Sequence, residues 1–221
     1  MPAAVSRRDI VTRVAMRTVE VFAEVLCPFT HVGLRALIDR RSDRGLTEPH
    51  LRIRAWPLEL INGQPLDPHH IGAEIAALRA SVRPDLFVGF SLGGFPRSSM
   101  AAFALTTAAD RTGDPALVEE VGIALRNAVF EDGLDIGCPE VVEPIASSFG
   151  LEPLTADATS AAVRADWEEG RRRGVIGSPH FFTADGGSWF CPALNISRDD
   201  VGAFVVAWKQ GADQFVDHVF D

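Results

Sequence analysis

Hydrophobic and polar positions divide the chain into two regions of extended structure with a long helical region between them. Apolar residues run together over residues 19–26 and alternate with polar ones at the start of residues 50–60, and both patterns are typical of strands. Between these strands a helical period covers residues 30–43, and Gly45 supplies its stop signal. A strand, a helix and a second strand in this order predict a right-handed parallel β-α-β unit.

From Pro68 to Gly174 the hydrophobic pattern has the period of helices. Proline, glycine or aspartate separates successive helical stretches, and Asp114-Pro115, Cys138-Pro139 and residues 155–157 are typical helix starts. A stretch of this length cannot be a loop, so we expect an inserted, all-helical subdomain. The predicted helices cover residues 71–81, 98–112, 115–131, 139–149 and 159–173.

Extended structure is predicted again after Gly174. Residues 175–182 have a strand pattern, Asp185-Gly186-Gly187 is a hairpin signal, and residues 188–191 begin the returning strand. A last helix is predicted over residues 198–210, capped by Asn195 or Ser197. Its apolar face would consist of Val201, Phe204, Val205 and Trp208.

Composition and charge narrow the class of partner. Of 221 residues, 47% are hydrophobic, which is enough to bury a substantial core. The net charge of -9 argues against a nucleic-acid partner, because phosphate binding needs clustered cations and Arg171-Arg172-Arg173 is the one dense basic run. No apolar stretch is long enough to cross a bilayer, and the first 15 residues lack an apolar signal core, so we expect a cytoplasmic protein without a membrane partner.

The three cysteines, Cys27, Cys138 and Cys191, have neither a metal-binding spacing nor the even number of a disulfide framework. We therefore expect three free thiols and no metal site. Cys27 alone is in an activating context, because the strand over residues 19–26 runs into a helix through Cys27-Pro28-Phe29-Thr30. Its sulfur would lie beside unpaired backbone N–H groups at the positive end of the helix dipole, which favours thiolate over thiol.

Two motifs resemble the thioredoxin superfamily, specifically its DsbA-like branch. That branch includes FrnE-type oxidoreductases and the relatives of 2-hydroxychromene-2-carboxylate isomerase and kappa-class glutathione transferase. Its members carry Cys-Pro-X-Cys, or a Ser variant, at the strand-to-helix junction, where this chain has Thr30 in place of the second cysteine. Residues 174–182 resemble the segment whose proline is cis and faces the active cysteine. The resemblance therefore implies that Pro179 is cis and that the Ser178 backbone is turned toward Cys27, where an extended partner could pair with it.

The resemblance implies an α/β, thioredoxin-like fold with a large all-helical insertion between its core β-α-β and β-β-α units. Residues 16–67 and 175–221 would form the core, and residues 68–174 the inserted helical subdomain. Residues 1–15 would be a flexible N-terminal extension.

The activity that the resemblance implies is that of a thiol-disulfide oxidoreductase with a single active-site cysteine. Cys27 would attack a disulfide, and the Thr30 hydroxyl would donate to its sulfur. No cofactor would be bound permanently, a low-molecular-weight thiol would serve as co-substrate, and the partner would be that thiol or a protein disulfide. A homodimer is compatible with the sequence. The residues expected to bind the substrate or the thiol are Pro28, Phe29, Arg97, Ser178 and Pro179.

Without a second cysteine in the motif, three routes remain open for the reaction. A small thiol could attack the mixed disulfide, or Cys138 could approach from the insertion, although a capping or buried thiol is the commoner role for such a residue. Alternatively, Cys27 and Thr30 could position a thiol cofactor for isomerase or transferase chemistry. A further hypothesis is a non-catalytic binding module that kept the fold and lost the dithiol. Cys191 is interpreted as strand packing.

Three ionisable residues are further candidates for roles in the site. Glu24 precedes Cys27 by three residues and could relay protons if it is buried, whereas strand alternation could equally place it in solvent. His31 could pair with the thiolate, although a surface histidine in the first helical turn is the commoner case. Arg97, at the end of the glycine-rich stretch 89–97, could hold a carboxylate of a peptide-like thiol. The aromatic residues expected in the walls of a cleft, or else in the core, are Phe29, Trp56 and Phe181.

Overall fold

A four-stranded mixed sheet lies at the centre of the fold in the computed structural model, which describes residues 18–210 and 212–220. The strand order is β2-β1-β3-β4, with β1 and β2 parallel and the other neighbours antiparallel. The extension predicted at residues 1–15 lies outside the described residues. The strands are β1 (Thr18–Ala23), β2 (His50–Ala55), β3 (His180–Phe182) and β4 (Ser188–Phe190).

The predicted β-α-β unit is present, with helix α2 (Pro28–Asp43) connecting the parallel strands β1 and β2. Cys27 is the N-cap residue of α2, and Pro28 takes the first helical position, where its missing N–H leaves no hydrogen bond unmade. Gly45 follows the helix with a φ of +66°, a conformation that glycine adopts without steric cost.

Strand β2 ends at Ala55, earlier than residue 60, where we expected it to end. Residues Leu58–Ile61 instead form a short helix, α3, with Pro57 as its N-cap residue. Proline has no N–H to donate to a strand ladder, and it suits the start of a helix. Pro57 therefore ends the strand and begins the turn that follows it.

All five helices predicted between residues 68 and 174 are present. Asp114 and Thr155 cap two of them by accepting hydrogen bonds from backbone N–H groups, as their positions in the sequence predicted. One continuous hydrophobic core contains residues of the sheet and of α2 as well as Phe103 and Leu125 from the inserted helices. The helices are α4 (Pro68–Ser81), α5 (Met100–Arg111), α6 (Pro115–Phe130), α7 (Pro139–Ser148) and α8 (Ala156–Arg172).

The prediction of a helix over residues 198–210 is wrong. An antiparallel hairpin of β5 (Leu194–Arg198) and β6 (Phe204–Trp208) occupies that part of the chain. The last helix, α9 (Ala212–Phe220), follows the hairpin. The order of elements in the C-terminal unit is therefore a sheet hairpin, a second small hairpin and a helix.

A tight turn explains why residues 198–210 do not form a helix. The Asp199 carboxylate accepts hydrogen bonds from the N–H groups of Val201 and Ala203, and Gly202 has a φ of +82°. Asp and Gly in these positions close a turn and interrupt helical backbone. Val201, which we expected on an apolar helix face, is 88% exposed at the tip of the hairpin.

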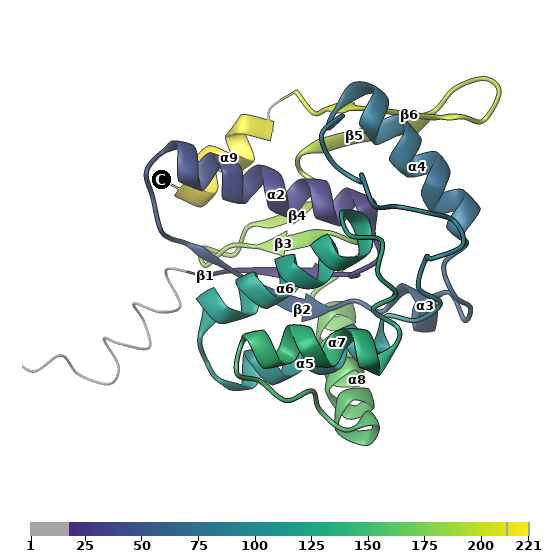
Figure 1. Ribbon diagram of the computed structural model, residues 1–221. Helices are drawn as coiled ribbons and strands as arrows, with labels where there is room; N and C mark the ends of the chain where they lie inside the picture. Colours follow the sequence, from purple (N-terminus) through teal and green to yellow (C-terminus); the bar gives the residue numbers. More distant parts are fainter. Residues whose placement is uncertain (1–17, 211, 221) are drawn as a thin grey trace, which may run out of the picture.

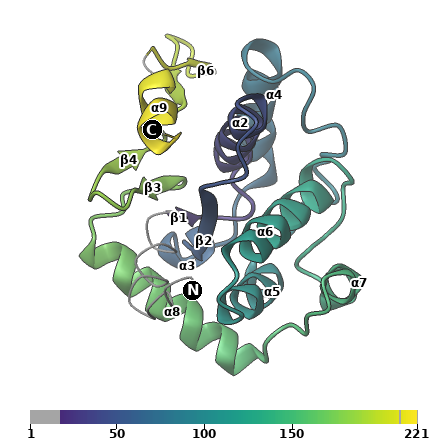
Figure 2. The same ribbon diagram turned by 90° about the vertical axis from the view of Figure 1, so that its left-hand side faces the viewer.

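The helices form layers on both faces of the sheet. In Figures 1 and 2, α2 and α9 cover one face and α8 crosses the opposite face. Helices α5 and α6 pack beside β2, at the edge of the sheet. The β5–β6 hairpin lies next to α4, beyond the end of α2 at which Cys27 is located. This arrangement encloses the start of α2 between the insertion and the C-terminal unit.

Candidate active site at the start of helix α2

The two motifs that the sequence singled out meet at the N-terminus of α2. The Cys27 thiol donates a hydrogen bond to the carbonyl oxygen of Ser178, with 3.4 Å between sulfur and oxygen. The Ser178–Pro179 peptide bond is cis. The sulfur therefore lies at a helix N-terminus and against the residue that precedes a cis-proline, although the two motifs are 151 residues apart in the sequence.

The expected lowering of the Cys27 pKa is wrong for this structure. Burial raises the pKa of the thiol to about 11, and the nearby Glu74 carboxylate raises it further. Hydrogen bonds from Thr30 and Ser178 lower the pKa by a smaller amount. The Cys27 side chain is 5% exposed, so the cost of removing a thiolate from water outweighs the helix dipole. At neutral pH the residue is a thiol.

The β5–β6 hairpin contributes to this burial. Phe204 packs edge-on against Phe29, with ring centroids 6.5 Å apart, and against His70 at 5.2 Å. His70 in turn lies 3.4 Å from the Glu74 carboxylate on the same helix. The hairpin and α4 thus cover the first turn of α2.

Thr30, which replaces the second cysteine of the family motif, connects α2 to the cis-proline segment. Its hydroxyl lies 2.6 Å from the Ser178 hydroxyl, which also accepts a hydrogen bond from the Glu24 N–H at 2.8 Å. The Thr30 side chain is fully buried. The hydroxyl group therefore fixes the geometry of the site, and it is one of the groups that lower the pKa of Cys27.

Glu24 is fully buried, so the alternative that placed it in solvent is wrong. Its two carboxylate oxygens accept hydrogen bonds from the N–H groups of Leu26 (3.1 Å) and Leu58 (2.9 Å). Burial raises the pKa of Glu24 to about 7 and outweighs these hydrogen bonds, which act in the opposite direction. The carboxyl group can therefore gain or lose a proton near neutral pH, as a proton relay requires.

Arg126 belongs to this cluster, and the sequence reasoning missed it. Its guanidinium is fully buried on α6 and donates to the carbonyl oxygens of Gly122 (2.8 Å) and Glu24 (3.2 Å). Burial lowers the pKa of Arg126 to about 10, while the Glu24 and Cys27 anions raise it, so the group is a cation at neutral pH. Its Nε atom has no hydrogen-bond partner among the described residues. The available signal was an arginine four residues after Gly122 on the apolar face of a predicted helix.

Both sequence-based expectations for His31 are wrong. The ring is fully buried, so it is not a surface histidine, and its Nε2 atom lies 2.8 Å from Glu131 and not beside the sulfur. The ring packs between Phe87 and Phe130 at 5.4 and 5.2 Å. Burial lowers the pKa of His31, and Glu131 partly opposes this change. His31 therefore connects α2 to the insertion.

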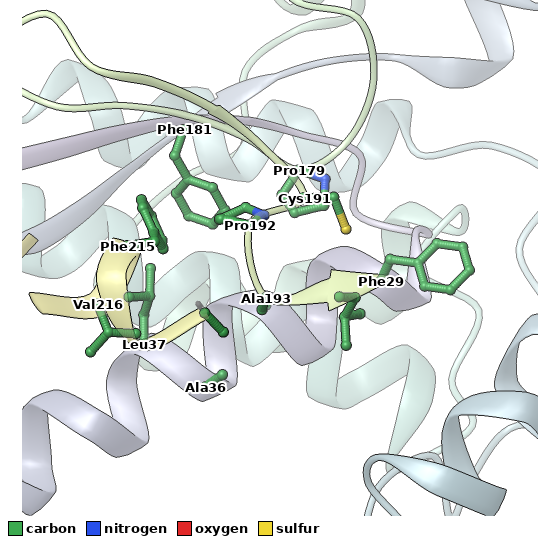
Figure 3. Close-up of a pocket in the computed structure, with 13 residues that line it drawn as sticks. Phe29, Ala36, Leu37, Pro179, Phe181, Cys191, Pro192, Ala193, Phe215 and Val216 are labelled. Carbon is green, nitrogen blue, oxygen red and sulfur yellow. The ribbon is translucent and has the colours of Figure 1, made fainter. Parts of the chain in front are cut away.

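A small apolar cavity lies beside the cis-proline (Figure 3), with a volume of about 20 Å³, room for roughly one water molecule. Phe29, Pro179 and Phe181 line it together with Cys191. For Trp56 the second of the two expected places, the core, is the correct one, because it is buried and packs against Phe22 in a separate apolar cluster.

Two further candidate residues lie at the surface. Arg97 is exposed in the loop before α5, and the neighbouring Ser98 donates to the Glu59 carboxylate at 2.9 Å. Cys138 is exposed at the start of α7, where its thiol donates to Asp135 at 3.5 Å. Their roles stay predictions. Within the described residues no group of three or more His, Cys, Asp or Glu side chains could hold a metal ion, and no helix is long and apolar enough to span a membrane.

Comparison with known proteins identifies the family. The family model of the DSBA-like thioredoxin domain matches residues 18–196. The chain belongs to this family. A search of curated protein sequences finds no significant match.

Solved structures of several DSBA-like and related proteins share the fold. A probable DsbA oxidoreductase from Streptomyces coelicolor is 16% identical with a TM-score of 0.58, over 92% of this chain and 88% of that chain. The cytosolic disulfide reductase DsbM from Pseudomonas aeruginosa is 17% identical with a TM-score of 0.58, over 92% of this chain and 97% of that chain. A 2-hydroxychromene-2-carboxylate isomerase is 16% identical with a TM-score of 0.54, over 78% of this chain and 88% of that chain. At these identities the likeness shows the shared fold.

Proposed function

We propose that this DSBA-like protein is a thiol-disulfide oxidoreductase in which Cys27 is the attacking residue. The observation that carries the proposal is the contact between the Cys27 sulfur and the Ser178 carbonyl, directly before the cis-proline. A disulfide partner that takes the place of this carbonyl contact would lie beside the sulfur at the helix N-terminus. There the backbone N–H groups can stabilise the thiolate while it attacks.

Glu24 and Arg126 supply the proton and charge chemistry of the proposed reaction. Cys27 must lose its proton before it attacks, and Glu24, three residues before it and with a pKa of about 7, is the proposed relay for this proton. The relay is in fast equilibrium with solvent, so the rate of attack follows the fraction of Cys27 that is thiolate. The Arg126 cation lies close enough for the Cys27 anion to raise its pKa, so it stabilises the thiolate as that forms.

We propose that the protein works in the reductive direction. An oxidant of this kind depends on a stabilised thiolate in its reduced form. Burial at Cys27 has the opposite effect, because it raises the pKa of the thiol to about 11. A thiol that is poorly stabilised as its anion gives up electrons readily, which suits reduction of a partner disulfide. The likeness to a cytosolic disulfide reductase agrees with this direction.

The partners are proposed from the same chemistry. The motif on α2 is of the monothiol type, since Thr30 stands where a second cysteine would resolve the mixed disulfide. A low-molecular-weight thiol is therefore the proposed co-substrate, and a small or protein disulfide is the proposed substrate. We further propose a cytoplasmic location, where a reducing environment would keep the three free cysteines reduced. Homodimer formation stays a prediction that sedimentation equilibrium can check.

Turnover of a model disulfide tests the proposal. The reduction of bis(2-hydroxyethyl) disulfide by glutathione would be followed for the wild type, C27S and C138S. We expect C27S to lower kcat/KM by a factor of at least about 100, because the nucleophile is lost, and C138S to stay within about twofold of the wild type. Equal activity of C27S and the wild type would contradict the proposal.

A thiol-cofactor-dependent isomerase or transferase is the second candidate function. The specific observation that favours it is that Cys27 is held as a thiol, which can donate a hydrogen bond to the sulfur of a bound cofactor. In that case C27S would keep much of its activity toward a conjugated aromatic substrate in the presence of glutathione. A chain with neither activity and no reaction of Cys27 with disulfides would instead be a binding module.

A further inference from the structure

A second buried thiol, Cys191, lies beside the same dipeptide that contacts Cys27. The Cys191 N–H donates to the carbonyl oxygen of Pro179 at 3.0 Å, while the Cys27 thiol donates to the carbonyl oxygen of Ser178 at 3.4 Å. The Cys191 contact extends the β3–β4 pairing, in which His180 faces Phe190, by one residue pair. Because facing residues of antiparallel strands have Cα atoms only about 4.5–5.5 Å apart, Cys191 lies directly across from the cis-proline.

The sulfur of Cys191 points toward the start of α2. Cys191 is 6% exposed and lines the cavity with Phe29 and Pro179. In Figure 3 its sulfur points away from Phe181 toward the side of the cavity where Phe29 lies. Phe29 is two residues after Cys27 in the first turn of α2. The side chain is thus directed at the element that carries the attacking thiol.

Two further observations distinguish Cys191 from an ordinary packing residue. Its backbone has a φ of +40°, a left-handed conformation that residues other than glycine rarely adopt and that is often retained at functional sites. The Cys27 anion raises the pKa of Cys191, in addition to the larger effect of burial, which agrees with the placement of both residues against the Ser178–Pro179 dipeptide. Cys138, by comparison, is exposed at the start of α7 and donates to Asp135.

We propose that Cys191 is the resolving thiol for the reaction at Cys27, an inference that rests on the proposed function. The Cys27 thiolate attacks a low-molecular-weight disulfide, forms a mixed disulfide and releases one small thiolate, which takes up the proton of Cys27. The Cys191 thiolate then attacks the Cys27 sulfur and expels the second small thiolate, which takes up the proton of Cys191. Two protein thiols are oxidised by two electrons, and one small disulfide is reduced to two small thiols.

The surroundings of the two sulfurs are compatible with this outcome. The Cys27–Cys191 disulfide is uncharged, as are the two buried thiols that it replaces, so burial does not oppose the product. The mixed disulfide would then be resolved within the protein even though Thr30 replaces the usual second cysteine. The resolving thiol would come from the far side of the cis-proline segment, and two molecules of a small thiol would regenerate the dithiol.

Peptide mapping of oxidised variants tests the proposal. C138S removes the exposed cysteine and leaves the two buried ones. After reduced C138S reacts with bis(2-hydroxyethyl) disulfide and is quenched in acid, we expect the peptides of Cys27 and Cys191 to be linked, with no adduct retained. In C138S/C191S we expect Cys27 to keep a 2-hydroxyethanethiol adduct. Circular dichroism would check that both variants are folded. The same peptide map of the wild type would show which cysteines are linked when none is substituted.

The outcomes separate this proposal from the proposed function. A lasting adduct on Cys27 in C138S, with Cys191 still free, would overturn the role of Cys191 and leave Cys27 as the attacking thiol. The absence of any modification at Cys27 in folded C138S/C191S would overturn the proposed function and this proposal with it. A Cys27–Cys138 link in the wild type would assign resolution to the other cysteine.

Discussion

Three buried ionisable side chains, Cys27, Glu24 and Arg126, determine the chemistry of the site at the scale of single residues. Burial raises the pKa of the two acids to about 11 and about 7 and lowers that of the arginine to about 10. In each case burial shifts the pKa in the direction of the neutral form, because a charge loses solvation in an apolar surrounding, although Arg126 stays a cation at neutral pH. Near the sulfur the site therefore has a cation, Arg126, and a carboxyl group, Glu74, whose pKa is about 7, as is that of Glu24.

The pKa of Glu24 predicts how stability depends on pH. The folded state holds this proton more tightly than the unfolded state, so the free energy of unfolding falls as pH rises from about 4.5 to about 7 and is level above that. The contribution of Glu24 to this fall is about 3 kcal/mol. We expect E24Q to remove the contribution of Glu24 to this fall. The free energy of unfolding should then fall less in E24Q than in the wild type across this pH range. Glu74 has a similarly raised pKa and makes the same contribution in both proteins. Parallel stability curves for wild type and E24Q, measured by urea unfolding, would contradict the burial of a titrating carboxyl group.

The residues of the site were predictable from the sequence only where local signals exist. Cys27, Ser178 and Pro179 are in short motifs, so they could be named. The partner of His31 is 100 residues away in the sequence, and Arg126 contacts a carbonyl oxygen 102 residues away. Such contacts depend on how α6 packs against α2 and against the segment that follows β1, and no local sequence pattern predicts this packing. Burial of Cys27 has the same origin, and for this reason the helix-dipole argument gave the wrong direction for its pKa.

At the scale of elements, we expect the β5–β6 hairpin to limit access to the sulfur. Phe204 on β6 packs on Phe29 and His70, so it covers the first turn of α2. Arg198 lies over the Phe204 ring at 4.0 Å and holds it in place. We therefore expect that a substrate disulfide reaches Cys27 more readily when this cover shifts.

Removing the Phe204 ring should therefore expose Cys27. We expect F204A to raise the rate of Cys27 alkylation by iodoacetamide several-fold at fixed pH, because both access and solvation of the thiolate improve. V205A is the matched control, since Val205 is on the same strand and is 47% exposed. Site-resolved mass spectrometry in the C138S background gives the rate at Cys27. Equal rates in F204A and V205A would show that the hairpin does not limit access.

Elements were predictable where capping residues and periodicity agree. Helices α4 to α8 were all expected, because proline, aspartate or threonine marks the start of most of them. The segment 198–210 was mistaken for a helix because its apolar residues fit both periods. The turn signal Asp199 to Gly202 was the local evidence that should have decided for a hairpin.

At the scale of the whole molecule, the insertion and the thioredoxin-like core share one hydrophobic core and buried polar contacts. Glu119 on α6 accepts hydrogen bonds from the Arg41 guanidinium on α2 and from the Leu51 N–H on β2, each at 2.8 Å. His31 and Glu131 form a second connection between α2 and the insertion. We therefore expect the two parts to unfold together.

Breaking the Glu119 contact should destabilise both parts at once. We expect E119Q to lower the free energy of unfolding by about 3–5 kcal/mol, because it leaves the largely buried Arg41 guanidinium without its counter-charge. E169Q is the matched control, since Glu169 pairs with the exposed Arg172 and its loss should cost less than about 1 kcal/mol. Unfolding would be followed by circular dichroism and by tryptophan fluorescence. Two separate transitions, with one unaffected by E119Q, would contradict a shared core.

The pH dependence of disulfide exchange at Cys27 itself tests the account most directly. Reduced C138S would be mixed with bis(2-hydroxyethyl) disulfide between about pH 6 and pH 9, and the modified residue identified by mass spectrometry at each time point. A reactive thiol with a pKa of about 11 predicts modification that begins at Cys27, with a rate constant that rises about tenfold per pH unit and shows no plateau in this range. A rate that levels off below about pH 8, or modification that begins at Cys191, would contradict the account.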